Sequence, residues 1–84
     1  MTGRIIDKET GEPLIGAEVW ICRQVATGQE GKPYYTDTAG RFAAPDYDET
    51  VLIRAGYIGY KMAEGMTNGD QDKCIGLEPL WMEG

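Results

Sequence analysis

Glycine and proline interrupt this sequence so often that no long element fits between them. Twelve glycines and four prolines separate short runs of β-branched and aromatic residues within 84 positions. Such punctuation is typical of an all-β domain. No window carries apolar residues at the 3.6-residue spacing of an amphipathic helix, so we expect no long helix. We therefore predict an all-β fold, a seven-stranded β-sandwich built from two sheets.

Alternating apolar and polar positions predict where the strands lie. We expect strands at Gly3–Asp7, Ala17–Arg23, Tyr34–Asp37, Arg41–Ala44, Thr50–Tyr57, Tyr60–Glu64 and Lys73–Glu78, with loops at Val25–Pro33 and Met66–Asp72. The inward positions, which should form the core, are Ile5, Leu14, Ala17, Val19, Ile21, Phe42, Val51, Ile53, Tyr57, Ile75 and Leu77. One domain should span residues 1–84, with its core at 3–78 and a short C-terminal tail at 79–84.

Several large apolar side chains fall on the outward side of their strands, where a lone sandwich should be polar. Ile6, Trp20 and Leu52 take outward positions, and Trp81 lies in the tail. Two interpretations stay open, because scattered exposed apolar residues are common on folded proteins. If the four residues cluster, they form a patch suited to a protein partner, with tryptophan as an anchor. They are our candidate partner-binding residues.

Histidine and serine are absent from the sequence. Their absence removes the Ser-His-Asp triad, any Cys-His pair and histidine-based zinc or iron sites. We therefore expect no enzyme, no catalytic residue, no cofactor and no metal. Asn68–Asp72 alternates oxygen-bearing side chains as a calcium loop does, but Lys73 stands where that loop needs glycine and Pro79 where it needs glutamate. We interpret this segment, and the acidic turn Asp46–Glu49, as solvated loops.

The charge balance limits the partners. Fourteen acidic residues against eight basic ones give a net charge of −6, the opposite of what phosphate binding needs. We expect no nucleic-acid partner and, since the apolar runs are short, no direct membrane insertion. No apolar leader precedes the first strand, so we expect either a domain taken from a longer exported protein or a short stand-alone protein.

Cys22 and Cys74 leave two alternatives open. A disulfide would form only in an oxidising compartment, and two cysteines in a chain of this size are as easily free thiols. Both fall on the outward side of their strands by the same alternation.

The ordered motifs of the chain resemble one family. They are Gly-x-Ile-x-Asp from Gly3, Thr-Gly-Glu-Pro-Leu-x-Gly-Ala-x-Val from Thr10, Thr-Asp-x-x-Gly-x-Phe from Thr36, Gly-Tyr-Lys from Gly59, and apolar-x-Leu-Glu ending at Glu78. This combination resembles the carboxypeptidase-regulatory-like domain, a transthyretin-like and immunoglobulin-like β-sandwich. The physical basis of these motifs is structural: Pro13 directs Leu14 inward, while Gly11 and Gly40 suit turns with positive φ. The segment Ala26–Lys32 is longer than the usual hairpin of the family.

The resemblance implies an accessory role. Such domains follow the catalytic domain of some metallocarboxypeptidases, precede the plug of TonB-dependent outer-membrane receptors of Bacteroidota, and occur in surface and phage structural proteins. Our first hypothesis is a non-catalytic structural or protein-interaction module that docks on a larger assembly, such as a virion or cell-surface structure. The alternative is an accessory domain of a TonB-dependent receptor or a carboxypeptidase, in the periplasm or outer membrane for a receptor. The receptor interpretation would require a plug beyond Gly84.

Overall fold

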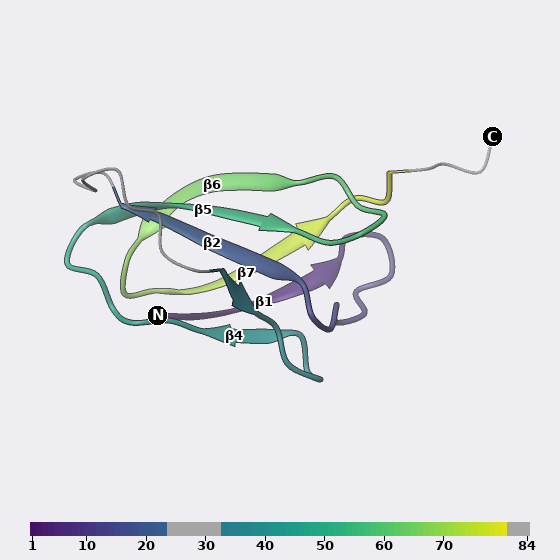
Figure 1. Ribbon diagram of the computed structural model, residues 1–84, viewed down its shortest axis with the longest axis horizontal. Coiled ribbons are helices and arrows are strands. Elements are labelled where there is room, and N and C mark those ends of the chain that lie inside the picture. The colour runs from purple at the N-terminus through teal and green to yellow at the C-terminus, as the bar shows by residue number, and fades with distance from the viewer. Residues whose placement is uncertain (24–32, 81–84) are drawn as a thin grey trace.

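A computed structural model describes residues 1–23 and 33–80, and in this part of the chain the fold is all-β, with two sheets packed as a sandwich (Figure 1). One sheet has three strands in the order β4 (Arg41–Ala43), β1 (Thr2–Asp7) and β7 (Asp72–Leu77). The other has four, in the order β3 (Tyr34–Tyr35), β2 (Glu18–Arg23), β5 (Thr50–Gly56) and β6 (Ala63–Asn68). This confirms the predicted fold class.

The strand register fixes which side chains face the core. In the three-stranded sheet β1 pairs antiparallel with β4 and parallel with β7, so that Ile5 lies opposite Ile75. In the four-stranded sheet all pairs are antiparallel, and Val19 and Ile21 face Ala55 and Ile53. Inward and outward positions alternate along each strand, as the two-residue period of a strand requires.

The core lies between the sheets. Its buried apolar members are Met1, Ile5, Leu14, Ala17, Val19, Phe42, Val51, Ile53, Ala55 and Leu77. Most of the predicted core is therefore confirmed. Ile21, Tyr57 and Ile75 are only partly buried at its margin, a correction to the prediction, and Met1 was not predicted as a core residue.

The predicted position of the sixth strand is wrong, although the strand itself is present. Tyr57 to Tyr60 form a turn, closed by a hydrogen bond from the Tyr60 N–H to the Tyr57 carbonyl and by a positive φ of 84° at Gly59. The strand begins only at Ala63 and continues to Asn68, through residues we assigned to a loop. Its composition (Ala, Glu, Gly, Met, Thr, Asn) has little β-propensity, so pairing with β5 decides its conformation.

Smaller boundary errors arise at turns. β3 ends at Tyr35, β4 at Ala43 and β5 at Gly56, each one or two residues before the predicted end, and β2 begins one residue late, at Glu18. β7 starts at Asp72, inside the predicted loop. The predicted loop Val25–Pro33 lies outside the described residues except for Pro33.

Backbone turns explain the motifs that carry the family resemblance. Gly11 and Gly40 have φ of 79° and 74°, the left-handed region that glycine enters without steric cost. One carboxylate oxygen of Asp37 accepts hydrogen bonds from the N–H groups of Ala39 and Arg41, closing the turn before β4. These bonds, with that of Arg41 foremost, lower the pKa of Asp37. Within the described residues, no helix is long and apolar enough to cross a bilayer.

Candidate functional site

The outer face of the four-stranded sheet carries several apolar side chains that lie outside the core. Its cross-strand rows follow from the register: Trp20 lies opposite Arg54, and Cys22 lies opposite Leu52. Leu52 in turn lies opposite Met66 on β6. We call the set Trp20, Cys22, Tyr35, Leu52, Met62 and Met66 the apolar sheet face.

Three side chains of this face are exposed, and the others are partly buried. Tyr35, Met62 and Met66 are 59%, 58% and 51% exposed, whereas Trp20 and Leu52 are partly buried. Exposed methionine and tyrosine supply adaptable, polarisable contact area, which is over-represented at protein interfaces. The apolar sheet face thus has the composition of an interaction surface.

Two of the charged side chains on this face pair with each other. Arg54 donates from Nε to Oε2 of Glu64 over 2.6 Å, directly across the β5–β6 pair. The two opposite charges compensate one another, so the row beside Trp20 adds no net charge to the surface. The outer face of the three-stranded sheet is more polar, since Thr2, Arg4, Arg41 and Asp72 lie there.

The four sequence-predicted partner-binding residues do not form a single patch. Trp20 and Leu52 share the apolar sheet face. Ile6 is outward as predicted, but it lies opposite Gly76 in the three-stranded sheet, on the other side of the sandwich. Trp81 lies outside the described residues. The sequence reasoning missed Tyr35, Met62 and Met66, and for Met66 the reason is that the alternation on β6 is visible only once that strand is correctly placed.

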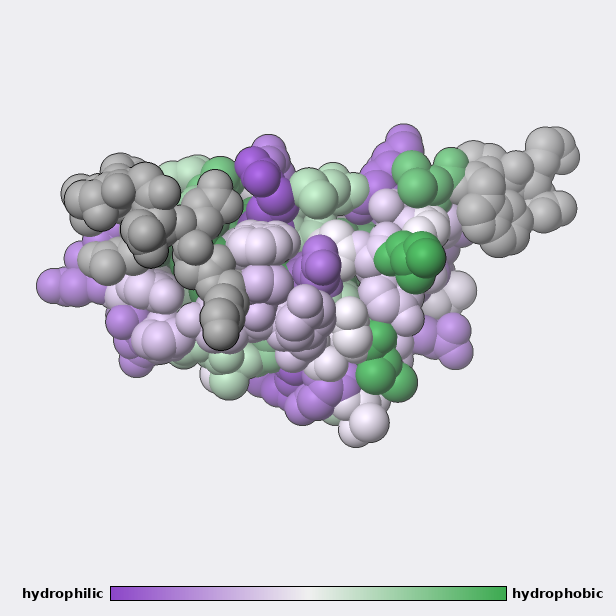
Figure 2. All heavy atoms as spheres, viewed as in Figure 1, coloured by the Kyte–Doolittle hydropathy of each residue, from purple (hydrophilic) through white to green (hydrophobic). Residues whose placement is uncertain are grey.

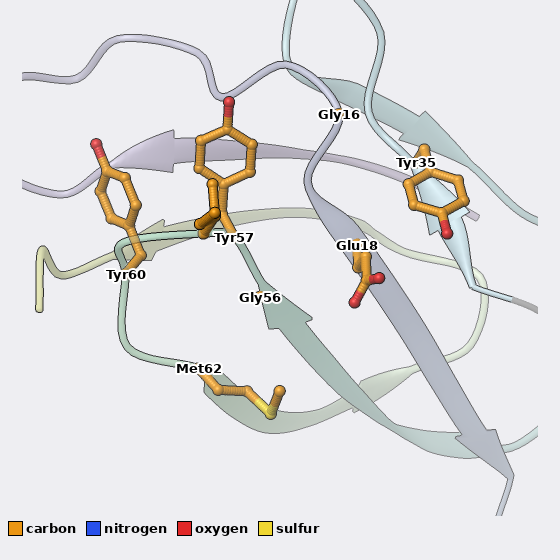
Figure 3. A pocket seen from close by; sticks show the side chains of 8 residues that line it. Gly16, Glu18, Tyr35, Gly56, Tyr57, Tyr60 and Met62 are labelled. Atoms are coloured by element: carbon orange, nitrogen blue, oxygen red, sulfur yellow. The ribbon is translucent and has the colours of Figure 1, made fainter.

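A surface hollow of about 460 Å³ lies at one end of the apolar sheet face, and we call it the tyrosine groove (Figure 3). Tyr35 stands on one side, and Tyr57 and Tyr60 on the other, with Glu18 projecting between them from β2. Met62 forms a further margin.

Two glycines leave the space that the groove occupies. Gly56 lies directly opposite Glu18 in the β2–β5 pair and has no side chain to fill the sheet surface there. Gly16 precedes β2 with a φ of 79°, and a Cβ built on it would meet no atom within 4 Å. These two glycines therefore contribute only backbone to the lining, and Cε of Met62 lies 3.4 Å from the point where a Cβ on Gly56 would be.

The Tyr60 ring is held in place by a buried carboxylate. Its hydroxyl donates to Oδ2 of Asp7 over 2.6 Å, while Oδ1 of Asp7 accepts from the N–H groups of Glu9 and Thr10. The Tyr60 hydrogen bond is the main reason that the pKa of Asp7 is lowered, and the same bond raises the pKa of Tyr60 to about 12. Tyr57 packs against Tyr60 with ring centroids 5.7 Å apart, so this wall is preorganised.

Glu18 is the charged group of the groove. Within residues 1–23 and 33–80, its carboxylate makes no ion pair and accepts no hydrogen bond. No lysine or arginine is among the described residues that line the groove. The groove therefore combines aromatic walls with one uncompensated negative charge.

Further apolar groups lie at the same end of the sandwich. Ile58 is 89% exposed at the tip of the turn between β5 and β6. Leu80 is also exposed, and its N–H donates to the carbonyl of Gly59 in that turn. Figure 2 shows strongly apolar groups gathered at this end of the molecule, on the right of the view. The apolar surface thus extends beyond the sheet.

Two acidic segments that we interpreted separately meet in space. Asp48 and Glu49 line a second hollow together with Asn68 and Asp70. Asp72 is not part of it; its Oδ1 accepts a hydrogen bond from Thr2 and contacts Arg41. Among the described residues, no three histidine, cysteine, aspartate or glutamate side chains are placed to hold a metal ion.

The two cysteines are free thiols on opposite sheets. Cys22 lies on the apolar sheet face, and Cys74 lies opposite Arg4 on the outer side of the three-stranded sheet. The core separates them, so a disulfide between them within one chain would require the sandwich to open.

Comparison with known proteins gives one weak similarity. No family model matches the chain. It is 29% identical over 82 residues, 95% of its length, to part of Bacillopeptidase F from Bacillus subtilis (strain 168). The aligned part is 5% of that relative, so the chain spans only a small share of a much longer protein.

Proposed function

We propose that this chain is a non-catalytic protein-interaction module that docks on a larger assembly, such as a virion or cell-surface structure, through its apolar sheet face. The observation that carries the proposal is the exposure of Tyr35, Met62 and Met66 around Trp20 and Leu52 on one side of a single sheet. Exposed apolar side chains grouped on one sheet face of a small domain are typical of a protein-binding site.

The sequence supports the non-catalytic part of the proposal. Without histidine and serine, the usual nucleophile and general-base pairs of hydrolases cannot be assembled. The tyrosine groove offers one carboxylate, Glu18, and no histidine, cysteine or second carboxylate among its described lining residues to complete a familiar hydrolytic pair. Binding is the activity that such a groove supports best.

A second candidate role is an accessory domain of a larger peptidase or of a TonB-dependent receptor. The observation in its favour is the alignment with 5% of Bacillopeptidase F, a protein named as a peptidase. The motifs from Gly3 to Glu78 favour the carboxypeptidase-regulatory-like family, whose members are attached to larger proteins. In this case the apolar sheet face would contact another domain of the same polypeptide, so both roles use the same surface.

Site-specific photocrosslinking tests the proposal. A benzophenone amino acid is placed at Met62 or Met66 on the apolar sheet face, and at Ala43 or Arg4 on the opposite sheet as matched exposed controls. The cells or particles that carry the chain are irradiated, and crosslinked proteins are identified by mass spectrometry. We expect one protein at both methionine positions and none at the controls. Crosslinks only at Ala43 and Arg4, or none at any position, would overturn the proposal.

A further inference from the structure

We propose that the tyrosine groove binds a lysine or arginine side chain presented by the protein partner. The inference deepens the proposed function and rests on it, since it names the chemistry of the segment that docks there. The occupant is a short apolar stretch of protein with one basic residue at its centre. Three features of the groove carry the argument: its uncompensated carboxylate, its aromatic walls and its position at the margin of the apolar sheet face.

The carboxylate argues for a cation. Glu18 projects into the hollow without an ion pair or hydrogen bond among the described residues (Figure 3). A purely apolar ligand would remove water from this carboxylate without supplying a hydrogen bond or an opposite charge, which is costly for a charged group. An anionic ligand would be repelled by it. A guanidinium or ammonium group satisfies the carboxylate and restores the lost hydrogen bonds.

The aromatic walls suit the same ligand. Cations are attracted to the faces of tyrosine rings, and the alkyl stems of lysine and arginine pack on apolar surface beside them. Tyr35 is 59% exposed, and Tyr57 is supported from behind by Tyr60. Because Tyr60 is hydrogen-bonded to Asp7, this wall is already ordered before a ligand binds, and binding does not incur the entropy cost of ordering it.

The size and overall charge agree with this occupant. A volume of about 460 Å³ falls within the range of pockets that hold small ligands, about 300–1,000 Å³. The chain carries a net charge of −6, which raises the rate of encounter with a basic partner. On the adjoining sheet face the guanidinium of Arg54 is already paired with Glu64, so it does not neutralise Glu18.

Peptide titration followed by NMR tests the inference on the purified chain. The probe is the acetylated and amidated pentapeptide Thr-Leu-Arg-Leu-Thr, with matched peptides carrying lysine or the neutral isostere citrulline at the centre. We expect the arginine or lysine peptide to shift the amides of Glu18, Tyr35 and Gly56. The citrulline peptide should bind about 2- to 5-fold more weakly, the range of an exposed ion pair.

Variants separate the groove from general electrostatics. Glu18→Gln should reduce affinity for the arginine peptide by a similar factor and abolish its preference over citrulline. Asp70→Asn, which removes the same charge from the acidic hollow on another part of the surface, should have no effect. Tyr57→Leu should also weaken binding, through loss of the aromatic face.

Any of the following outcomes would overturn the inference: equal binding of the citrulline peptide, no effect of Glu18→Gln, shifts confined to the acidic hollow, or no binding of any peptide. Groove shifts that appear on raising the chain's own concentration without peptide would replace the partner with a second copy, and they overturn it too. None of these results bears on the crosslinking pattern. The proposed function can therefore stand when the basic-residue inference fails, and the peptides can bind when the crosslinks fail.

Discussion

The hydroxyl of Tyr60 donates a hydrogen bond of 2.6 Å to Oδ2 of Asp7, joining the turn after β5 to the end of β1. These residues are 53 positions apart in sequence and belong to the two different sheets or their connections. The bond closes one end of the sandwich and holds the wall of the tyrosine groove. The same hydrogen bond therefore supports both the fold and the candidate site.

This bond predicts a pH dependence of stability. Because the pKa of Asp7 is lowered by folding, its contribution is present above its usual value of 3.8 and is lost as the pH falls below it. The pKa of Tyr60 is raised from 10 to about 12, so its contribution is present below pH 10 and is lost as the pH rises toward 12. Stability should decline at both ends of the scale.

Tyr60→Phe tests the acid limb. The variant should be less stable than the wild type at pH 7, and the difference should shrink as the pH falls below 3.8, because the lowered pKa of Asp7 contributes stability that is lost in that direction. Urea unfolding at the two pH values measures this change. Tyr57→Phe is the matched control, because the described residues give its hydroxyl no hydrogen bond and its removal should leave the pH dependence unchanged. An equal loss from Tyr60→Phe at both pH values would contradict the account.

Thr36 makes a buried polar link between the segment after β3 and the connection between β1 and β2. Its hydroxyl accepts a hydrogen bond from the Ala17 N–H and donates to the Leu14 carbonyl. Thr36→Val keeps the shape but leaves both backbone groups unsatisfied, at a cost of about 1–3 kcal/mol. The exposed Thr38→Val is the control and should change stability by less than about 0.5 kcal/mol. Similar urea midpoints for the two variants would show that the Thr36 hydrogen bonds do not contribute to the stability of the fold.

Gly69 has no room for a side chain. A Cβ there would lie 2.6 Å from Cβ and the carbonyl oxygen of Tyr47, across the contact between two turns. Gly69→Ala should cost about 1–3 kcal/mol through overpacking. At Gly65, on edge strand β6, a Cβ meets nothing within 4 Å, so Gly65→Ala should be neutral or slightly stabilising. Thermal unfolding of both variants checks the order, and a reversed order would mean that the turns are not packed as described.

Phe42 is the largest apolar side chain in the predicted core, and its burial is confirmed at 3% exposure. It packs over Gly3, where a Cβ would lie 2.5 Å from the ring. Phe42→Ala should cost about 3–5 kcal/mol, comparable to the whole stability of a small domain. We expect a largely unfolded protein by NMR. Native chemical shifts in this variant would contradict the assignment of Phe42 to the core.

The core was predictable because local sequence and tertiary structure agree there. Ile5, Val19, Val51 and Ile53 lie on strands with clean alternation, and the turns at Gly11 and Gly40 require glycine. At such positions residue type and spacing carry the information.

The candidate site was only partly predictable, because it depends on pairing. Trp20 and Leu52 were assigned outward from their own strands, and the register brings them to one face. Met66 joins them only through a strand whose composition does not favour β-structure. The tyrosine groove depends on Gly56 lying opposite Glu18, a relationship between residues 38 positions apart that no local pattern contains.

The affinity of the crosslinked partner for Trp20→Ala tests the central claim most directly. An interface tryptophan commonly contributes about 2 kcal/mol, which corresponds to an about 30-fold weaker Kd. We measure Kd by calorimetry for the wild type and for Trp20→Ala, after checking by circular dichroism that the variant is folded at the assay temperature. The account predicts a loss of this size. An unchanged Kd for a folded Trp20→Ala chain would contradict docking through the apolar sheet face.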